Sequence, residues 1–597
     1  MNAPERLTGT AQATARPASV AWIDALSATA SIQSHPHRLL CHIIEERAAT
    51  HGAAPALLSD IESFSFAELS TRIDAYAAWA RGAGLGKGDC VALIMSNRPE
   101  YVAIWMGLSK LGIVTALINV NLSGASLAHC LKVAMPKCAI VESGFMRAVT
   151  ASLALSGQSL DLWCHGASDM AVRRIDTNLS RAPSPVCSEA SVTVNDRALL
   201  IYTSGTTGLP KAAHVSHRRI LNWALWFKGM LGNTEADRMY DCLPLYHSVG
   251  GIVAVAATLV AGGSTVIAEK FSARRFWPDI RRWNCTQFQY IGELCRYLLN
   301  AGVTPEETGH SIRVACGNGL RADVWTPFQQ RFGIPQILEF YAATEGSFSL
   351  FNAEGKPGAI GRVPPFLRHR FPTSIVRFDS ETGKPQRDEN GFCIAAAHGE
   401  PGEAIGRIGG TDGSGQFEGY TDQHESERKV LRNVFKEGDM WFRTGDLMRV
   451  DSAGYYFFVD RVGDTFRWKG ENVSTLEVAN VLSTALGVAD VAVYGVPVPG
   501  ADGKAGMAFL QVENGFDPAT LLRHVSRELP AYAVPLFLRV GPVMTLTETF
   551  KHKKQELVRD GFDPAASGDV IYVRLEEGYT LVDATLHGRI NAGELRL

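Results

Sequence analysis

An apolar run that begins at Leu199 passes without a break into the loop Thr203-Ser-Gly-Thr-Thr-Gly-Leu-Pro-Lys211. The glycines let successive backbone N–H groups converge, the hydroxyls add donors, and Lys211 supplies a positive point charge. The loop is not a Walker A motif, because no Gly-Lys-Ser/Thr triplet closes it. A flexible Ser/Thr/Gly linker is the plainer alternative, but linkers rarely follow an apolar strand directly. The segment therefore predicts a buried strand that ends in a polyphosphate-binding loop.

Apolar runs alternate with segments of helical periodicity on both sides of this loop. A helical pattern over 66–80 is followed by an apolar run at 90–95, a helix over 99–111 and a run at 113–117. A second stretch of the same kind begins at Ala198 and reaches about residue 345. Strands that alternate with helices are the signature of a parallel α/β layer. We therefore predict an α/β fold with parallel αβα layers.

The pattern changes twice after this region. From about 346 to 460 the chain shows short β-like runs, and beyond them the capping box Ser474-Thr-Leu-Glu477 opens a helix. The last segment, about 130 residues, is typical of a small α+β domain. We predict a poorly ordered leader over 1–35, an N-terminal domain over 36–461 with its β-rich part at about 346–461, and a mobile C-terminal α+β domain over 462–597.

The composition excludes several classes of protein. The 597 residues correspond to about four domain-sized units. The chain carries 58 Lys and Arg against 61 Asp and Glu, a net charge of −3, which leaves no global basic field for a nucleic acid. A hydrophobic content of 46% and a mean hydropathy near zero describe a globular protein, and they exclude a disordered chain and a polytopic membrane protein.

Cysteine usage and the first residues indicate the compartment. The eleven cysteines are odd in number and lack Cys-x-x-Cys spacing, so neither a disulfide framework nor a zinc site is predicted. The N-terminus has no apolar core of a signal peptide. The apolar stretch 249–268 is interrupted by four glycines and is interpreted as a buried helix followed by a strand. We expect a cytoplasmic protein, and peripheral contact with the inner face of the membrane stays open.

The loop at 203–211 resembles the phosphate loop of the adenylate-forming superfamily, which includes acyl-CoA synthetases, luciferases and peptide-synthetase adenylation domains. Five further segments resemble motifs of that superfamily in the expected order. They are Pro244-Leu-Tyr-His247, Cys316-Gly-Asn-Gly319, Tyr341-Ala-Ala-Thr-Glu345, Thr444-Gly-Asp446 and Asp460-Arg461, followed by Lys551 at the place of the catalytic lysine. One such segment alone is a weak signal, whereas six in order make a strong one.

The resemblance implies a role for each of these residues. Catalytic roles fall to Lys551, Glu345 and His247. The residues that it assigns to ATP or AMP are Thr203, Ser204, Gly205, Thr206, Thr207, Gly208, Lys211, Gly317, Asn318, Gly319, Tyr341, Thr344, Glu345, Asp446, Arg461 and Lys551. Glu345 and Thr206 are the implied magnesium ligands, Lys469 and Gly470 the implied coenzyme A contacts, and Gly463 the hinge about which the C-terminal domain closes over the active site.

Each role has a plainer alternative that the residues leave open. Lys551 could be a solvated charge in the basic run 551–554, and His247 a hydrogen-bonded core histidine. Asp446 could be a turn aspartate and Glu345 a helix cap or surface residue. The aromatic residues of the helical stretch 223–227 could line an acyl-chain tunnel, although aromatic stripes more often belong to the core.

A finer resemblance is to the fatty acid transport protein group of long- and very-long-chain acyl-CoA synthetases. It rests on Asn97-Arg-Pro-Glu-Tyr101, Ile118-Asn-Val-Asn-Leu122, the stretch 459–473 and Thr549-Phe-Lys-His-Lys553, and it extends from about residue 40 to the C-terminus. The sequence departs from the group at Ala342, where glycine is common. It also shows no membrane-spanning N-terminus like that of the animal members, which favours a ligase over a transport role.

The function predicted is that of an ATP-dependent long- or very-long-chain fatty acid:CoA ligase acting through an acyl-adenylate. ATP, Mg²⁺ and coenzyme A are its expected cofactors and co-substrates, with fatty acid as the other partner and no nucleic acid; a homodimer stays open. Alternatives are a medium-chain or aryl acid CoA ligase and an acyl-AMP ligase that feeds a carrier protein. From another class, a fatty-acid uptake protein with incidental ligase activity also remains.

Overall fold

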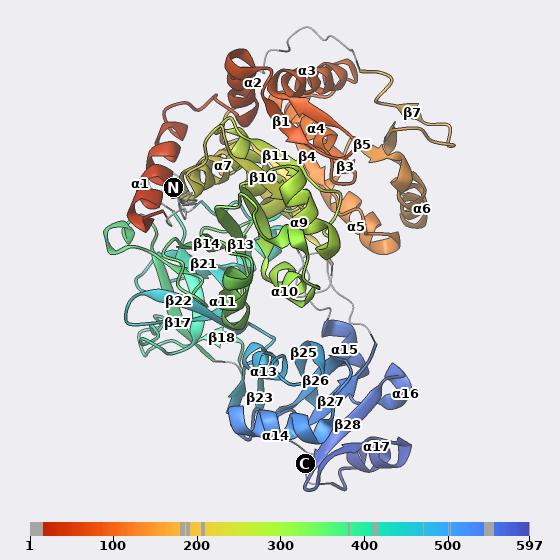
Figure 1. Ribbon diagram of the computed structural model, residues 1–597, viewed down its shortest axis with the longest axis vertical. Coiled ribbons are helices and arrows are strands. Elements are labelled where there is room, and N and C mark those ends of the chain that lie inside the picture. Colours follow the sequence, from red (N-terminus) through yellow and green to blue (C-terminus); the bar gives the residue numbers. More distant parts are fainter. Residues whose placement is uncertain are drawn as a thin grey trace, which may run out of the picture. The chain divides into compact units, whose positions relative to one another are not determined.

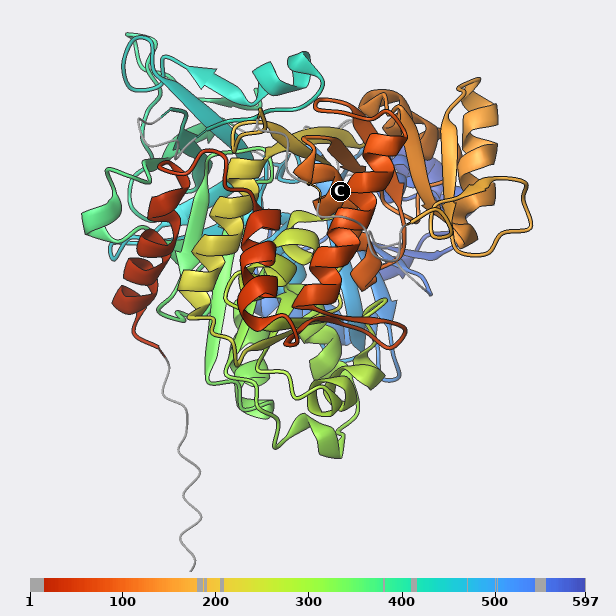
Figure 2. The ribbon, with the colours of Figure 1, turned by 90° about the horizontal axis from the view of Figure 1, so that it is seen from above.

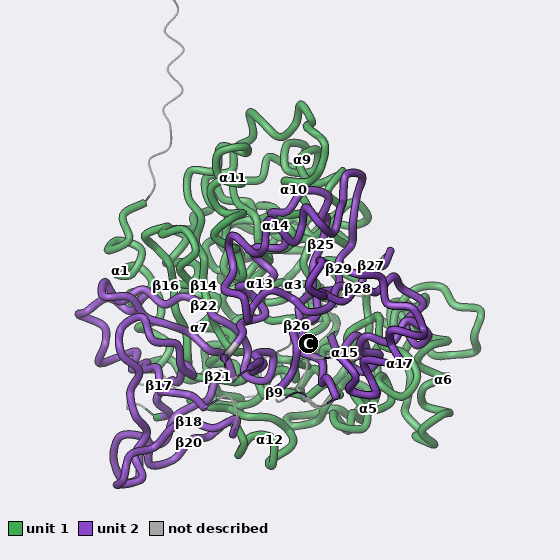
Figure 3. The backbone as a smooth tube through the Cα atoms, turned by 90° about the horizontal axis from the view of Figure 1, so that it is seen from below, with its two compact units in different colours: residues 1–361, 409–429 green, residues 362–408, 430–597 purple. Residues whose placement is uncertain are grey.

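The protein is described here from a computed structural model (Figure 1). The structure describes residues 16–179, 186, 191–203, 209–379, 382–409, 416–469, 471–499, 501, 503–542, 554–595 and 597. The chain divides into two compact units (Figure 3). Unit 1 comprises Met1–Gly361 and Gly409–Lys429, and unit 2 comprises Arg362–Ile408 and Val430–Leu597. The domain boundaries expected from the sequence stay a prediction.

The first sheet of unit 1 has seven strands in the order β7-β6-β5-β3-β4-β8-β9. All neighbours pair in parallel except β8 and β9, which form a hairpin. The strands are β3 (Cys90–Ile94), β4 (Val114–Leu117), β5 (Cys138–Glu142), β6 (Asp161–His165), β7 (Arg173–Arg174), β8 (Arg197–Thr203) and β9 (Lys211–Ser216). Helices α3 (Phe66–Gly82), α4 (Pro99–Lys110), α5 (Gly124–Ala134) and α6 (Met146–Ser156) alternate with them, and η2 (Ser143–Phe145) precedes α6. The predicted parallel α/β layer is confirmed.

Helix α3 shows why these segments fold as the periodicity predicts. Ser65 and Glu68 form a capping box at its start, in which the Ser65 hydroxyl accepts the Glu68 N–H and the Glu68 carboxylate accepts the Ser65 N–H. This arrangement satisfies two of the backbone donors that a helix N-terminus leaves unpaired. The face at helical spacing from Phe66 to Ala80 is buried in the core that α3 shares with α4.

The second sheet contributes eight strands to unit 1, in the order β15-β14-β13-β12-β10-β11-β1-β2. They are β1 (Pro55–Leu58), β2 (Ser63–Ser65), β10 (Arg238–Asp241), β11 (Ser264–Ile267), β12 (Gln287–Ile291), β13 (Val314–Asn318), β14 (Gln336–Ala342) and β15 (Ser349–Asn352). Its helices are α2 (Leu40–His51), α7 (His217–Leu231), the π-helix η3 (Val249–Ala254), α8 (Val255–Leu259), α9 (Ala273–Arg282), α10 (Gly292–Asn300), η4 (Pro305–Glu307), α11 (Ala322–Arg331) and α12 (Gln423–Arg428). Strands β10 to β14 pair in parallel.

The apolar stretch 249–268 is buried, as predicted. It forms η3 and α8, followed by β11, and most of these residues belong to the unit 1 core. Over the described part of the chain, every helix is too short or too polar to cross a membrane.

The leader contains a helix that its Ala/Ser/Thr-rich composition did not predict. Residues Ala18–Thr29 form α1, continued by the short turn η1 (Ala30–Ile32), and Figure 2 shows α1 in red beside the yellow α7. The two backbones approach so closely that an added Cβ at Gly229 would overlap Ala25. Trp22 is buried and packs edge to face on Trp226, with ring centroids 5.7 Å apart. Burial of this tryptophan supplies the stabilisation that the composition conceals.

Unit 2 contains an antiparallel sheet and an α+β portion. The sheet runs β18-β17-β19-β21-β22 with β20 against β21, and its strands are β17 (Thr373–Asp379), β18 (Lys384–Pro385), β19 (Gly402–Arg407), β20 (Val430–Arg432), β21 (Met440–Val450) and β22 (Tyr455–Arg461). Two short elements, β16 (Gly361–Arg362) and η5 (Pro365–Leu367), lie where the chain enters this unit.

The α+β portion has its own core around a five-stranded sheet in sequential order. Its strands are β25 (Val488–Pro497), β26 (Lys504–Val512), β27 (Phe537–Val540), β28 (Val570–Leu575) and β29 (Gly578–Leu581), beside the hairpin β23 (Phe466–Trp468) and β24 (Glu471–Val473). Its helices are α13 (Thr475–Leu482), α14 (Pro518–Glu528), α15 (Lys554–Asp560), α16 (Pro564–Ser567) and α17 (Ala584–Asn591). Ser474 caps α13 by accepting the N–H of Glu477, as its sequence predicts.

Candidate active site

The predicted phosphate loop connects β8 to β9, and the structure describes its two ends. Thr203 and Lys211 lie opposite each other in the register of the hairpin. The Lys211 ammonium is paired with the carboxylate of Glu425 in α12. Both side chains are largely buried. The ammonium group that the sequence assigns to phosphate binding is therefore engaged in an ion pair with Glu425. The predicted residues Ser204, Gly205, Thr206, Thr207 and Gly208 lie outside the described residues.

Glu345 is a buried carboxylate, with 7% of the residue exposed. The Tyr420 hydroxyl donates to its Oε1 at 2.5 Å, and the Lys429 ammonium lies 3.7 Å from the same oxygen. Burial and the adjacent Glu345 charge raise the pKa of Tyr420, which therefore stays a neutral donor. Thr344 Oγ1 lies 3.3 Å from Ser248 Oγ. Glu345 is thus a buried carboxylate fixed by hydrogen bonding rather than an exposed surface residue.

Sequence reasoning missed Arg219 of α7, whose guanidinium binds backbone carbonyls on both sides of Glu345. Its guanidinium donates to the carbonyl oxygens of Thr344 at 2.9 Å and Gly346 at 2.8 Å. It also donates to Gln416 O at 2.6 Å and forms an ion pair with Glu418 at 3.2 Å. An arginine on an otherwise buried helix face was the available signal, because a buried cation needs partners.

The predicted adenine-binding turn Gly317-Asn318-Gly319 leaves the carboxyl end of β13. Gly319 adopts a left-handed φ of +83°, and an added Cβ at Gly317 would overlap the Tyr290 carbonyl oxygen. Both positions therefore require glycine. The Asn318 Oδ1 is buried and has no hydrogen-bond donor among the described residues. An unpaired buried acceptor of this kind is suited to a ligand donor.

The turn is held by Glu339 of β14, which sequence reasoning also missed. One carboxylate oxygen accepts the N–H groups of Gly319 and, at 3.0 Å, of Leu320. The other accepts the Tyr290 hydroxyl at 2.5 Å. Burial raises the pKa of the Glu339 carboxyl to about 8. A single glutamate inside an apolar strand was its only sequence signal.

Tyr341 lies two residues beyond Glu339, at the carboxyl end of β14. Strands β13 and β14 are parallel neighbours, and Gly317 is opposite Glu339 in their register. Their carboxyl ends therefore share one edge, where α/β sheets place ligands. The Tyr341 ring packs edge to face on Phe348 at 5.5 Å. The structure thus brings Tyr341 to the same edge as the 317–319 turn.

His247 closes the turn 243–247 that follows β10. Its N–H donates to Pro244 O at 3.2 Å, its carbonyl accepts the Gly251 N–H at 2.7 Å, and its ring lies 4.7 Å from that of Tyr246. This turn leads through Ser248 into η3, and Ser248 contacts Thr344. His247 is therefore joined to the Glu345 loop by a continuous set of contacts.

The aromatic residues of α7 belong mainly to the core. Trp226 and Phe227 are buried among Trp22, Phe340 and Phe351. This packing favours the core alternative for both residues over a tunnel lining.

In unit 2, Asp446 and Arg461 lie opposite each other across β21 and β22, with 3.8 Å between Arg461 Nε and Asp446 Oδ1. Gly445 before the aspartate has φ +78°. The Thr444 hydroxyl accepts the Asp446 N–H at 3.0 Å and donates to Ala404 O at 2.7 Å. The pairing of β21 with β22 therefore positions Asp446, the residue assigned to ribose, beside Arg461.

The remaining predicted residues of unit 2 lie just beyond β22. Gly463 has φ +95°, and an added Cβ there would meet no atom within 4 Å. Lys469 adopts φ +52°, unusual for a side-chain residue, and its ammonium lies 5.5 Å from the Trp468 ring. Gly470 and Lys551 lie outside the described residues.

A salt-bridged cluster surrounds the predicted hinge and was not anticipated. The Asp460 carboxylate is buried and accepts the Thr475 N–H at 2.6 Å, and burial raises its pKa. Lys554 donates to Asp464 at 3.0 Å and to the Thr475 hydroxyl at 3.1 Å. The start of α15 is thereby tied to two residues that follow Gly463, and the Thr475 hydroxyl in turn donates to Asp460, which precedes it.

Comparison with known proteins identifies the class. Residues 44–404 match the AMP-binding enzyme family, and residues 477–551 match the AMP-binding enzyme C-terminal domain. The chain therefore belongs to the AMP-binding enzyme family, in its AMP-forming acyl-CoA ligase branch.

Two curated relatives cover nearly the whole chain. Long-chain fatty acid transport protein 1 of Mus musculus is 44% identical over 546 residues, 89% of this chain and 84% of its own. Long-chain fatty acid transport protein 2 of Rattus norvegicus is 39% identical over 568 residues, 93% and 90% respectively.

Solved structures share the fold at lower identity. The anthranilate CoA ligase AuaEII in complex with anthranoyl-AMP superposes with a TM-score of 0.74 at 22% identity, covering 87% of this chain and 96% of its own. ATP-bound MatB from Rhodopseudomonas palustris gives 0.72 at 22% identity, covering 87% and 98%. The predicted fold class and the predicted family are both confirmed.

Proposed function

We propose that this protein is an ATP-dependent long- or very-long-chain fatty acid:CoA ligase. The observation that carries the proposal is one sheet edge. There the 317–319 turn, Tyr341 and the buried Glu345 follow the carboxyl ends of β13 and β14. The long-chain part is supported by the relatives named above, whose identity of 39–44% extends over most of the chain.

In the first half-reaction, a carboxylate oxygen attacks the α-phosphorus of ATP. The bond from that phosphorus to the bridging oxygen breaks, and pyrophosphate leaves. We assign Asn318 Oδ1 to the adenine amino group, because it is a buried acceptor without a donor. Tyr341 supplies the stacking face and Asp446 accepts the ribose hydroxyls. Lys551 offsets the negative charge where carboxylate and α-phosphate meet.

In the second half-reaction, the thiol of coenzyme A attacks the acyl carbonyl of the adenylate. The carbon–sulfur bond forms, the carbon–oxygen bond to AMP breaks, and the thiol proton is released. We assign Gly463 to the rotation between the two steps, because its open surroundings permit large changes in φ and ψ. Lys469 and Gly470 are the proposed contacts of the pantetheine arm.

The residues present fit a magnesium ion. Glu345 offers a fixed carboxylate, and Mg²⁺ in nucleotide sites is typically held by one or two protein oxygens together with phosphates and water. Glu345 and Thr206 would hold it, and the ion supplies positive charge against the phosphates. Lys211 reaches the phosphates after its ion pair with Glu425 opens.

The direct test is ATP- and CoA-dependent thioester formation with acids of about 2 to 24 carbons, a series that adds apolar burial stepwise. We expect kcat/KM to be greatest at about 16 carbons or more. A maximum of kcat/KM among aryl or medium-chain acids would show that the substrate class is one of these rather than long-chain fatty acids. Binding of fatty acid without turnover of any acid would favour the uptake alternative.

The Lys551→Ala variant separates the half-reactions. It should lose acid-dependent pyrophosphate release and keep thioester formation from preformed acyl-adenylate. The opposite pattern would contradict the role given to Lys551. Peripheral membrane contact and a homodimer remain proposals, which vesicle flotation and sedimentation measure directly.

A further inference from the structure

The segment Asn97-Arg98-Pro99-Glu100 covers the end of the β3–α4 connection and the first residues of α4, and the proposed reaction uses none of it. Strands β4 and β5 lie on opposite sides of β3 in the parallel sheet. Ser96 after β3 and Glu142 at the end of β5 therefore lie at the point where the strand order reverses. Sheets of this kind open a ligand crevice at that point.

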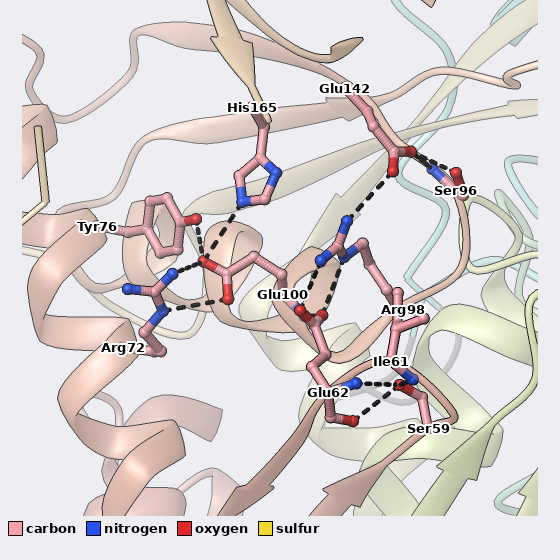
Figure 4. Close-up of polar contacts among 10 residues, drawn as sticks. All are labelled: Ser59, Ile61, Glu62, Arg72, Tyr76, Ser96, Arg98, Glu100, Glu142 and His165. Carbon is pink, nitrogen blue, oxygen red and sulfur yellow. Dashed lines mark hydrogen bonds and ion pairs between the residues drawn. The ribbon is translucent and has the colours of Figure 1, made fainter. Parts of the chain in front are cut away.

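Here the protein's own side chains form a network of hydrogen bonds and ion pairs at that point (Figure 4). Glu142 accepts the Ser96 N–H at 2.8 Å and the Ser96 hydroxyl. Arg98 donates to Glu142 at 3.2 Å and makes a two-pronged contact with Glu62 at 3.0 and 2.6 Å. Residues on both sides of Asn97 are thus anchored by charge-assisted hydrogen bonds.

The start of α4 is anchored as well. Glu100 is 1% exposed, and its carboxylate receives Arg72 at 3.1 and 2.5 Å and the Tyr76 hydroxyl. His165 at the end of β6 lies 3.8 Å from the same carboxylate. This network fixes the backbone from which the Asn97 side chain projects.

Asn97 itself reaches the other sheet of unit 1. Its Nδ2 donates to Leu243 O at 2.8 Å and to Ala268 O at 3.3 Å, while its Oδ1 accepts the Leu245 N–H at 2.9 Å. These bonds bracket Pro244, satisfying the carbonyl before it and the N–H after it. One side chain therefore clamps the turn 243–247 to the end of β11.

The turn 243–247 is also tightly packed on the side that faces η3. Gly250 and Gly251 of η3 approach it so closely that an added Cβ would overlap Pro244 O and Leu245 O respectively. His247 follows directly, and Ser248 contacts Thr344 beside Glu345. A displacement of Leu245 is therefore passed to His247 and to the Glu345 loop.

We propose that Asn97 is a positioning residue for the acid substrate, acting through the turn 243–247. The inference rests on the proposed function and on the catalytic role that the family resemblance implies for His247, which we assign to orienting the acid carboxylate. Asn97 contacts no substrate. Because misplacement of a reacting group by about 1 Å can cost about 100-fold in rate, a side chain remote from the chemistry can limit it.

The test is Asn97→Ala with acid and ATP varied separately. We expect kcat/KM for the acid to fall by about 10- to 100-fold, with a higher KM for the acid and a KM for ATP within about twofold. Asn352→Ala is the matched control. Asn352 makes the same three-bond clamp elsewhere, donating to Lys356 O and Ala359 O at 2.8 Å each and accepting the Lys356 N–H at 3.0 Å.

The Asn97→Asp variant adds a readout that a purely structural role does not predict. It keeps the acceptor for Leu245 N–H but, when ionised, presents negative charge to the carbonyls of Leu243 and Ala268. Those carbonyls raise the pKa of the introduced carboxyl, and its protonated form restores one donor. The KM for the acid should approach the wild-type value as pH falls from about 8 to about 6.

Two measurements separate failure of this inference from failure of the proposed function. If wild-type protein releases no pyrophosphate with any acid, the proposed function fails, and amide exchange over 243–248 still tests the clamp: faster exchange in Asn97→Ala but not Asn352→Ala supports it. If wild-type protein is active and both variants lower kcat equally without changing the KM for the acid, Asn97 has only a structural role. Unchanged exchange in Asn97→Ala would overturn the clamp.

Discussion

The predicted adenine-binding turn at Gly319 and the proposed hinge at Gly463 share two structural components but differ in their surroundings. Each has a left-handed glycine, with φ of +83° and +95°, and each lies beside a buried carboxyl group, Glu339 or Asp460. The backbone that leads into Gly319 is packed, because an added Cβ would overlap the Tyr290 carbonyl at Gly317 and the Gly319 carbonyl at Gly292, although at Gly319 itself it would meet its nearest atom only at 3.9 Å. Around Gly463 the space is open.

The carboxyl groups differ in how they are satisfied. Glu339 receives two backbone N–H groups and the Tyr290 hydroxyl, all from rigid strands or their ends. The cluster at Asp460 instead includes Lys554, a long cation on a separate helix. A turn fixed by short neutral donors forms a permanent binding surface, whereas a turn held by a long ion pair can be released.

The largest effect should come from filling the packed turn. Gly317→Ala would force a methyl group into the Tyr290 carbonyl and ring, and we expect a loss of about 3 kcal/mol in the free energy of unfolding with weakened ATP binding. Denaturant unfolding and ATP titration measure both. Gly302→Ala is the control, since an added Cβ there meets nothing within 4 Å. Equal losses in the two variants would contradict the packing argument.

The second prediction concerns the pH dependence that Glu339 imposes. Burial raises the pKa of Glu339 from 4.5 to about 8. Between those values the folded state holds a proton that the unfolded state has released, so stability falls as pH rises through this window. Glu339→Gln should flatten that slope at little cost near pH 6. The measurement is the free energy of unfolding from about pH 5 to 8. If it falls with pH as steeply in Glu339→Gln as in the wild type, the role given to Glu339 is wrong.

The third prediction releases the hinge cluster. Lys554→Ala removes the bonds to Asp464 and Thr475, and we expect about 1 kcal/mol less stability. Faster amide exchange over 460–475 should accompany this loss, and added salt should produce part of the same change in wild-type protein. Lys504→Ala, at an exposed position of β26, is the control. Equal exchange in both variants would mean that Lys554 does not restrain the hinge.

The fourth prediction concerns the open glycine. Gly463→Ala meets no atom and adds only the strain of a left-handed alanine, about 1 kcal/mol. Its functional effect should be selective, slowing thioester formation more than pyrophosphate release. Equal slowing of both half-reactions would contradict the role of Gly463 as the hinge of the rotation.

The sequence predicted those features that are encoded locally. Helical spacing predicted α3 and its buried face, the capping box predicted the start of α13, and the apolar run from Leu199 predicted the buried strand β8. What it could not predict depends on partners far apart in the chain. Asn97 meets Leu243, 146 positions away, and Lys211 meets Glu425, 214 positions away. Periodicity carries no information on such pairs.

Glu339 in β14 and Arg219 in α7 show the same limit of sequence-based prediction, because their partners also could not be foreseen. Glu339 stands among apolar residues of its strand and Arg219 shares a helix face with Trp223 and Trp226, so the burial of both could be predicted, but the groups they hold could not. Their partners are backbone N–H groups and carbonyls of loops. Every residue offers such groups, and only the folded arrangement selects among them.

The helix α1 shows that the conserved-domain boundary and the folding boundary differ in this chain. The family match begins at residue 44, yet α1 covers Trp226 and Phe351 with Trp22, and Arg16 donates to the carbonyls of Gly229 and Met230 at the end of α7. A chain shortened to the matched region would expose an aromatic surface to water. Its poor solubility would then reflect the choice of its first residue rather than any instability of the ligase fold.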